Sequence, residues 1–178
     1  DSILDSLRGE GRYAMPANVN TRPPRDGEQH GVDYYFVSPE EFQRLIDEDE
    51  LMEHAVVYGQ GKGVPKGPIR EALAQGRDVI KRTDIQGART IKKLAPQALT
   101  IFVAPPSEAE LEHRMKTRGG DTPEQVRIRL DTAKAEMAAA PEFDYTVIND
   151  DLERCTAEVE AILQRERSRR DRKPLTIT

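Results

Sequence analysis

Short apolar runs alternate with amphipathic helical segments along this chain, and this alternation limits its fold more than any other feature. The run ALTIFVA (98–104) is nearly continuously apolar, which is typical of a strand buried on both faces. DYTVIN (144–149) predicts a second buried strand, and helical segments follow at 107–117 and 151–167. Strands that alternate with helices predict an α/β fold, with a parallel sheet and helices on both of its faces.

Capping and turn signals predict the other elements. Ser38-Pro39-Glu40-Glu41 indicates a helix start, because Ser38 can cap, proline suits the first helical position and Glu41 completes a capping box. GQGKG (59–63) is predicted to be a glycine-rich loop. The remaining predicted helices are 2–8, 66–75 (stopped by Gly76), 86–94 and 123–139, and the remaining strands are 33–37, 51–58 and 78–83, with 13–20 weakly extended.

Composition narrows the classes of function. The chain has 178 residues, of which 33% are charged and 37% are hydrophobic, so we expect one soluble domain over 1–178. No run approaches the roughly eighteen apolar residues of a membrane helix. The net charge of −5 argues against a general nucleic-acid binder. The single cysteine, Cys155, fits a reducing cytoplasm and a place in the core.

The segment TRPPR (21–25) predicts an anion site. Its two prolines favour polyproline II, in which residues three apart point to the same side, roughly 9 Å from each other. Arg22 and Arg25 would then clamp a phosphate or a carboxylate. An exposed proline loop with ordinary arginines is the alternative.

Two carboxylates occupy positions at which an acidic side chain calls for a structural or functional explanation. Asp84 ends a predicted strand and begins a helix, where it could hold Mg²⁺ or a metal-bound water. A simple N-cap of the following helix is the alternative, which these residues alone favour. Glu53 lies within the strand LMEHAVVY (51–58), and a carboxylate among apolar residues needs a partner. An N–H-rich ring edge such as that of guanine would supply one; an ordinary edge-strand acid is the alternative.

Three arginines near a flexible joint suit phosphoryl transfer. Arg114 and Arg118 lie one helical turn apart, Gly119-Gly120 follows, and Arg129 lies on the next helix. Arginines on a closing segment can stabilise charge on a transferred phosphate. A salt-bridged amphipathic helix is the alternative. The sequence contains no G-x-x-x-x-G-K-[ST] phosphate loop around GQGKG, because Val56 stands where the first glycine is required and Val64-Pro65 follows the segment, without the Ser or Thr and the helix start that the motif needs.

Several stretches together resemble the guanylate kinase family, and their order and spacing agree from 18 to 152. They are TRPPRDGEQHGVDYYFVSPEEF (21–42), LMEHAVVYG (51–59), TDIQGA (83–88), FVAPPSEAELEHRMKTRGGDTPE (102–124) and VINDD (147–151). The resemblance implies a P-loop kinase-type three-layer fold with a parallel core sheet, a GMP-binding subdomain at 20–80 and a lid at 117–130. It also implies a cytoplasmic enzyme of purine metabolism that transfers a phosphoryl group from ATP to GMP or dGMP with Mg²⁺, as a monomer or a homodimer.

On the GMP side, the resemblance implies a role for each matching residue. Arg22, Arg25 and Tyr34 match positions that hold the GMP phosphate. Glu53 matches the carboxylate that reads guanine N1–H and the 2-amino group, a donor pair that adenine lacks.

On the ATP side, the three arginines Arg114, Arg118 and Arg129 match those that gather on the phosphates when the lid closes. Asn149 matches a residue beside the adenine of ATP, and Asp84 matches the second acid of an acid-x-acid motif near the metal.

The chain departs from the family pattern at several of these positions. Asn18 stands where serine is usual, Lys62-Gly63-Val64 where Tyr-Gly-Ser/Thr is usual, and Arg82 where the first acid of acid-x-acid is usual. Base recognition is therefore less firmly predicted than phosphate binding. A kinase for another phosphorylated small molecule is compatible with these changes.

The first helix, 2–8, resembles the helix that follows the phosphate loop in the family. We therefore expect this sequence to lack the strand and loop that cradle the ATP phosphates. Such a chain is expected to bind GMP weakly and to turn it over poorly. A non-catalytic guanylate-kinase-like module that binds phosphopeptides through Arg22, Arg25 and Tyr34 is the alternative.

Overall fold

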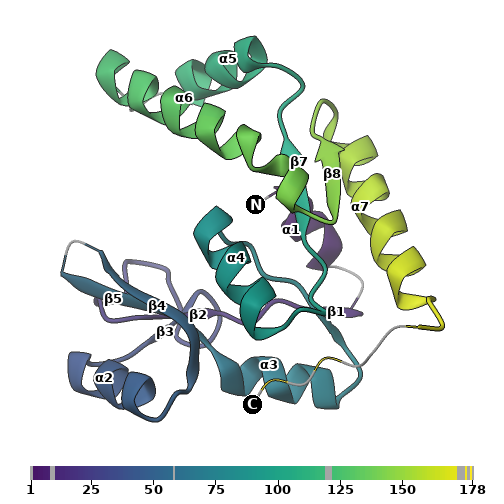
Figure 1. Cartoon of the computed structure of the whole chain (residues 1–178). Coiled ribbons are helices and arrows are strands. Elements are labelled where there is room, and N and C mark those ends of the chain that lie inside the picture. Colours follow the sequence, from purple (N-terminus) through teal and green to yellow (C-terminus); the bar gives the residue numbers. More distant parts are fainter. Residues whose placement is uncertain are drawn as a thin grey trace. The chain divides into compact units, whose positions relative to one another are not determined.

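The computed structural model describes residues 2–8, 11–57, 59–118, 122–171, 175 and 177. It has an α/β fold and divides into two compact units (Figure 1). Unit 1 comprises Asp1–Leu7 and Leu99–Arg172, and unit 2 comprises Arg8–Ala98 and Lys173–Thr178. Each unit is described separately below.

Unit 2 contains a four-stranded sheet in the order β3-β2-β5-β4. β5 pairs with both β2 and β4 in antiparallel fashion, and β3 runs parallel to β2. A second, two-stranded sheet pairs β1 with β6 in parallel. The elements are β1 (Tyr13–Ala14), β2 (Asn18–Asn20), β3 (Tyr34–Phe36), α2 (Pro39–Asp47), β4 (Leu51–Val57), β5 (Gln60–Pro65), α3 (Lys66–Ala74), β6 (Asp78–Val79) and α4 (Ile85–Leu94).

Unit 1 is built on one parallel strand pair, β7 with β8, whose register runs from Ile101 opposite Tyr145 to Ala104 opposite Ile148. The parallel strand pairing predicted from the alternation is confirmed. In the part of the chain that the structure describes, however, the pairs β1–β6 and β7–β8 form separate two-stranded sheets. The elements are α1 (Ser2–Arg8), β7 (Ile101–Ala104), α5 (Glu108–Arg118), α6 (Pro123–Ala138), a 3₁₀ turn (Ala140–Glu142), β8 (Tyr145–Ile148) and α7 (Leu152–Arg167).

Helix starts agree with the capping signals. The Ser38 hydroxyl accepts the Glu41 N–H at 3.1 Å, as predicted. The Glu41 carboxylate, however, binds the Arg44 guanidinium, at 2.7 and 2.9 Å, so no reciprocal capping box is found there. A capping box does occur at the start of α6, between Thr122 and Gln125.

The GQGKG segment is not a loop, and this prediction is wrong. Residues 60–65 form β5, because two of the glycines allow close packing against the neighbouring elements. A Cβ on Gly61 would lie 2.6 Å from the Phe42 ring, and one on Gly63 would lie 2.9 Å from a Leu51 methyl group. Glycine at these positions serves close approach inside a sheet rather than chain flexibility.

Two predicted strands are shorter and more exposed than expected. The strand predicted over 78–83 is limited to β6, since the following residues extend towards α4 without ladder pairing. β7 is not buried on both faces: Val103 is 41% exposed, and Ile148 beside it on β8 is 44% exposed.

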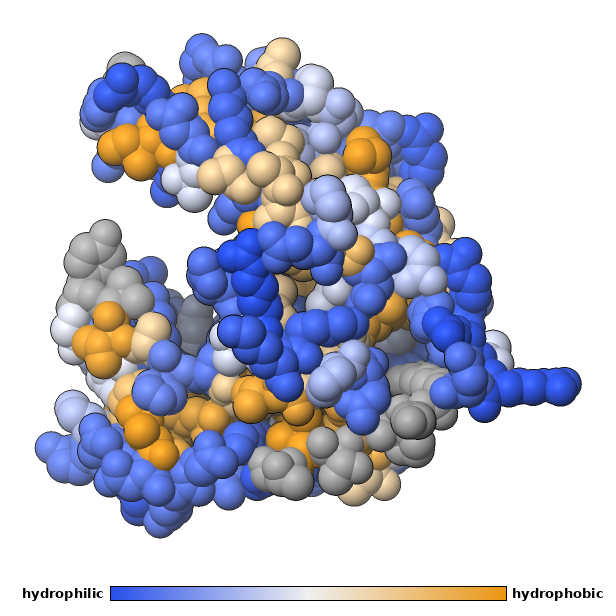
Figure 2. Space-filling model, viewed as in Figure 1, coloured by the Kyte–Doolittle hydropathy of each residue, from blue (hydrophilic) through white to orange (hydrophobic). Residues whose placement is uncertain are grey.

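The cores of the two units are separate clusters. In unit 2, Val19, Phe42 and Leu51 form one cluster, and Met52, Val64 and Ile69 form another. In unit 1, α7 buries one face of residues, Cys155, Val159 and Ile162, as its sequence period predicts. Hydrophilic residues cover most of the face drawn in Figure 2, which agrees with the charged composition. Within the described residues, helices suited to crossing a membrane are absent.

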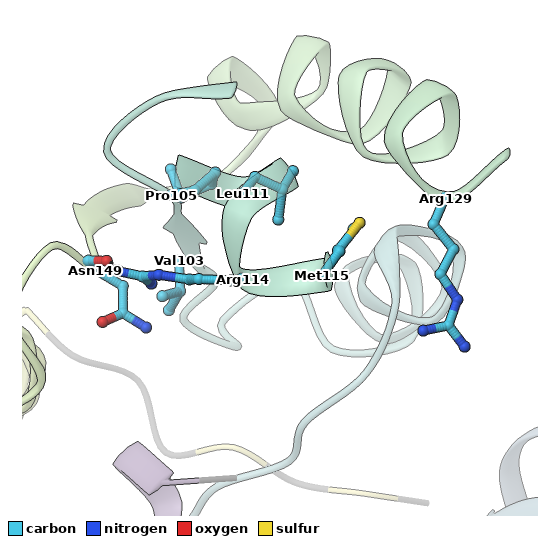
Figure 3. A pocket seen from close by; sticks show the side chains of 8 residues that line it. Val103, Pro105, Leu111, Arg114, Met115, Arg129 and Asn149 are labelled. Atoms are coloured by element: carbon cyan, nitrogen blue, oxygen red, sulfur yellow. Dashed lines mark hydrogen bonds between the residues drawn. The ribbon is translucent and has the colours of Figure 1, made fainter. Parts of the chain in front are cut away.

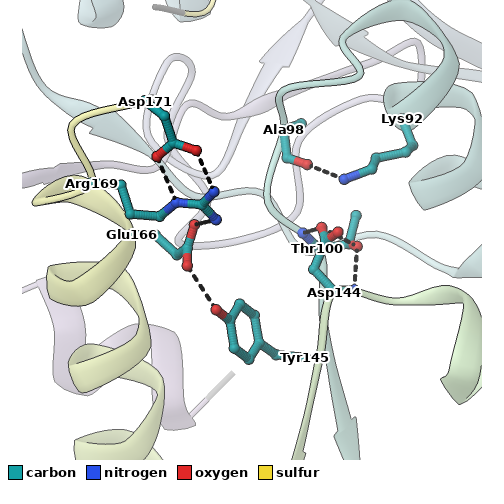
Figure 4. Close-up of polar contacts among 8 residues, drawn as sticks. All are labelled: Lys92, Ala98, Thr100, Asp144, Tyr145, Glu166, Arg169 and Asp171. Carbon is teal, nitrogen blue, oxygen red and sulfur yellow. Dashed lines mark hydrogen bonds and ion pairs between the residues drawn. The ribbon is translucent and has the colours of Figure 1, made fainter. Parts of the chain in front are cut away.

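Polar contacts tie α7 and β7 to β8 in unit 1 (Figure 4). The Tyr145 hydroxyl donates to the Glu166 carboxylate at 2.7 Å, and Arg169 binds the same carboxylate at 3.1 Å. At the start of the strand pair, the Thr100 N–H and hydroxyl both donate to Asp144 at 2.8 Å. These bonds fix the start of β8 against β7 and α7.

We predict that Gly61→Ala destabilises unit 2, because the added methyl group displaces the buried Phe42 ring. Overpacking of this kind costs about 1–3 kcal/mol. Urea unfolding of the variant measures the loss. The control is Gly67→Ala in α3, where a Cβ meets nothing within 4 Å and alanine favours the helix by up to about 1 kcal/mol. Equal stability of the two variants would contradict this packing.

Candidate active site

Arg22 stands at the centre of a charged and aromatic cluster in unit 2. Its guanidinium donates to both oxygens of Glu28 at 2.6 Å, and it lies over the rings of Tyr34 and Phe36 at 5.2 and 5.5 Å. The paired guanidinium lowers the pKa of Glu28 to about 2, first through the Arg22 hydrogen bonds. This arrangement preorganises Arg22 beside a phenol, as a phosphate site requires.

Arg25 is placed differently from Arg22. Its backbone N–H donates to the Glu28 carboxylate at 2.8 Å, so Glu28 closes the 22–28 loop from both sides. The Arg25 side chain is exposed, and within the described residues its guanidinium has no hydrogen-bond partner. The predicted clamp therefore has one arginine already held by an internal carboxylate and one that is free for an anion.

Glu53 lies on β4 in a row of residues that crosses three strands. It pairs with Val64 on β5, and the β2–β5 register continues this row to Asn18. Residues that pair directly across strands share one face of a sheet. Asn18, Val64 and Glu53 therefore lie side by side on the same face.

The Glu53 carboxylate is half-buried against the first turn of α4. A Cβ on Gly87 would lie 2.5 Å from one carboxylate oxygen, so only glycine leaves room for it. The Thr83 hydroxyl is 3.4 Å from the other oxygen, a long hydrogen bond. Burial raises the pKa of Glu53, and the nearby Asp84 charge adds to the rise. This acceptor is therefore partly withdrawn from water and receives one long hydrogen bond from Thr83.

The substituted family positions around Glu53 have different environments. Val64 is 3% exposed and packs with Met52 and Ile69, so its side chain belongs to the core. Lys62 is exposed and lies in the row of β5 that pairs with Asn20 and Ala55. Gly63 is buried against Leu51, and Arg82 is exposed just before α4.

Asp84 is the N-cap of α4. Its Oδ1 accepts the Gly87 N–H at 2.8 Å, which is the structural role that the sequence left open as an alternative. The carboxylate keeps a second oxygen, and Mg²⁺ commonly binds one or two carboxylates together with substrate phosphates. Among the described residues, groups of three or more potential metal ligands are absent, so a cation here would depend on the phosphates of a substrate.

A pocket of about 250 Å³ lies in unit 1. Figure 3 shows Arg114 extending from α5 towards Asn149, and Arg129 projecting from α6 beyond Met115. The Arg114 guanidinium donates to the Asn149 carbonyl at 2.9 Å and to Glu110 at 2.7 Å. The lining residues are Val103, Ala104, Pro105, Leu111, Arg114, Met115, Arg129 and Asn149.

Three of the five ATP-side residues named from the sequence, Arg114, Arg129 and Asn149, thus line one pocket. Arg118 ends α5, and its side chain lies outside the described residues, as do 119–121 of the predicted lid. The alternative of a salt-bridged helix is also realised in part, because Glu110 and Glu112 pair with Arg114 and Lys116.

Two functional candidates were missed by sequence reasoning. Glu28 orders the arginine loop, although its place six residues after Arg22 carries no local signal. Lys81 donates to the Pro16 carbonyl at 2.7 Å and to Asn18 Oδ1 at 2.5 Å. The sequence signal for Lys81 was the presence of a lysine directly after the apolar start of the segment DVIKRT (78–83).

Comparison with known proteins identifies what the chain is similar to. The guanylate kinase family model matches residues 3–166. A guanylate kinase of Cutibacterium acnes is 44% identical over 158 residues, which cover 88% of this chain and 79% of the relative. One of Thermosynechococcus vestitus is 47% identical over 150 residues, covering 84% and 78% respectively.

A solved structure agrees with these sequence matches. The crystal structure of guanylate kinase from Anaplasma phagocytophilum superposes with a TM-score of 0.75 at 31% identity. The superposition covers 96% of this chain and 84% of that one. The similarity therefore includes fold as well as sequence.

We predict that the pKa values of the two site carboxylates depart in opposite directions from the ordinary glutamate value, that of Glu28 downwards and that of Glu53 upwards. The pKa of Glu28 is about 2, so its ion pair is complete above the ordinary glutamate value of about 4.3 and is lost only as pH falls through about 2. Glu53, with its raised pKa, gains its proton first. Carbon-13 NMR of the side-chain carboxyls measures both.

The control for this titration is Arg22→Met, which should return the Glu28 pKa towards about 4.3 and leave that of Glu53 unchanged. Glu28 titrating at its ordinary value in the unaltered chain would contradict the paired geometry.

Proposed function

Because the chain belongs to the guanylate kinase family, we propose that it phosphorylates GMP with ATP and that unit 2 carries the GMP site. The reaction transfers the γ-phosphoryl group of ATP to the GMP phosphate and yields ADP and GDP. The observation that carries the residue assignment is the half-buried Glu53 carboxylate, which faces Gly87 with only one long hydrogen bond.

Base recognition follows from the chemistry of this carboxylate. An ionised carboxylate only accepts hydrogen bonds, and guanine presents N1–H and a 2-amino group side by side. Adenine presents an acceptor at N1 and would leave Glu53 unpaired. A buried acceptor left without its donors costs much of the binding energy, so the site would favour guanine.

Phosphate recognition is assigned to the arginine loop. Arg25 offers a free guanidinium, Arg22 is fixed over Tyr34, and the Tyr34 hydroxyl can donate to a phosphate oxygen. Lys62 adds an exposed positive charge on the sheet face that also carries Asn18 and Glu53. These groups would orient the GMP phosphate as the nucleophile for in-line attack.

The ATP side is assigned to the pocket of unit 1. Asn149 and the apolar residues around Leu111 would accept the adenine, and the arginines Arg114, Arg118 and Arg129 would stabilise charge on the transferred phosphoryl group. Mg²⁺ would arrive with ATP and neutralise phosphate charge, with Asp84 as the candidate carboxylate.

Phosphoryl transfer is measured as GMP-dependent formation of ADP by the protein. No ADP above the rate with ATP alone would contradict the proposal.

We predict that Glu53→Gln weakens GMP binding by about ten- to a hundredfold, because an amide cannot accept two hydrogen bonds as a carboxylate does. Calorimetric titration with GMP measures the change. Inorganic phosphate is the control ligand, and its affinity should stay unchanged. Equal loss for both ligands would indicate damage to the fold and would contradict a base-specific role.

We predict that Arg25→Met weakens GMP binding about tenfold or more without loss of stability, since its guanidinium makes no bond in the free chain. Arg22→Met should weaken binding and also destabilise the 22–28 loop, because Glu28 loses its partner. Calorimetry and thermal unfolding of both variants separate the two effects. Full affinity in Arg25→Met would contradict the phosphate assignment.

A further inference from the structure

Lys81 is a partly buried lysine whose side chain contacts Asn18, a residue of the proposed base site. It lies on the extended segment between β6 and α4 and is partly buried, while its neighbour Arg82 is exposed. Its ammonium group donates to the Pro16 carbonyl at 2.7 Å and to Asn18 Oδ1 at 2.5 Å. Asn18 is 63 residues away in the sequence, so this contact exists only in the folded sheet.

The contact with Lys81 determines which way the Asn18 amide faces. An ammonium group has three N–H donors and no acceptor, so it can bind only the oxygen of the amide. The Asn18 NH₂ group is then left as the part that is available to a ligand. Asn18 therefore presents a donor on the same face and in the same row as the Glu53 acceptor.

Lys81 also acts on Glu53 through its charge. The described titratable groups that act on Glu53 are Lys81 and Asp84; Thr83 and Gly87 add a hydroxyl and a backbone surface. Asp84 and burial favour the protonated acid, whereas the Lys81 ammonium and the Thr83 hydroxyl favour the carboxylate. Burial lowers the pKa of Lys81 to about 8, and Glu53 opposes this shift, so the ammonium persists at neutral pH.

We propose that Lys81 is a positioning residue for base recognition, which presents the Asn18 NH₂ group as a donor beside the Glu53 acceptor. A donor beside an acceptor matches guanine, whose O6 accepts while N1–H and the 2-amino group donate. The preference for GMP over AMP would then depend on a side chain that does not itself need to touch the nucleotide. This inference rests on the proposed function of unit 2.

The test compares the GMP-to-AMP affinity ratio in the unaltered chain and in Lys81→Met, at about pH 7.5 and about pH 6. Both nucleotides carry the same phosphate, whose second pKa is about 6, so the ratio cancels its titration. We expect the ratio to fall about tenfold or more in Lys81→Met at the higher pH. The fall should be found at both pH values. In the unaltered chain the ratio should stay nearly constant, because the Lys81 ammonium, with a pKa of about 8, persists at both.

Two further variants make the test specific. Lys81→Arg keeps the charge and should retain most of the ratio. Lys92→Met is the matched control, because Lys92 also donates to a backbone carbonyl of unit 2, that of Ala98 at 2.8 Å, outside the base site. Its ratio should equal that of the unaltered chain. If Lys81→Met does not fold, Lys81→Gln replaces it. An amide both donates and accepts, so it does not fix the orientation of the Asn18 amide, and the ratio must fall at both pH values.

The outcomes separate the inference from the proposed function. An unaltered chain that binds GMP no better than AMP would overturn the proposed function. A chain that prefers GMP and keeps this preference unchanged in Lys81→Met, at both pH values, would overturn only the role of Lys81. An equal fall in Lys92→Met would show a general effect of lost stability and would also overturn it.

Discussion

The desolvation of one carboxylate organises the site in unit 2. Glu53 is drawn from water by the close approach of α4, which only glycine at position 87 permits. The pKa of Glu53 rises as a result, and a single long bond from Thr83 does not satisfy the carboxylate. A group in this state binds a ligand with paired donors more strongly than an exposed glutamate would, because its hydration cost has been met during folding.

At the proposed phosphate end of the site, the pKa of the carboxylate shifts in the opposite direction. Glu28 is nearly surrounded by donors, so its pKa falls and it holds Arg22 over the ring of Tyr34. The loop is therefore ordered before any ligand binds, which reduces the entropy that binding would cost. Arg25 stays free for the anion. The comparisons favour the enzyme over a non-catalytic binding module, because the chain matches guanylate kinases over most of the length of those relatives.

Local signals predicted the helices well and the long-range contacts poorly. The Ser38 cap and the positive φ of Gly76 were predictable from residue type, as was the buried face of α7 that carries Cys155. The glycines of β5 looked like a loop because their packing partner, Phe42, is remote in sequence. The resemblance named Arg22, Tyr34 and Glu53 as candidates. It did not name Glu28 or Lys81, whose roles depend on pairing across the loop and across the sheet.

Mapping the GMP site by amide NMR shifts tests the central claim most directly. A nitrogen-15-labelled chain titrated with GMP should show its largest shifts in unit 2, at Glu53, at Gly87 and along the 22–28 loop. AMP should shift the loop and leave Glu53 and Gly87 nearly unchanged, because it shares the phosphate and lacks the donor pair. Shifts at Glu53 that are the same for GMP and AMP, or absent with both, would contradict the account.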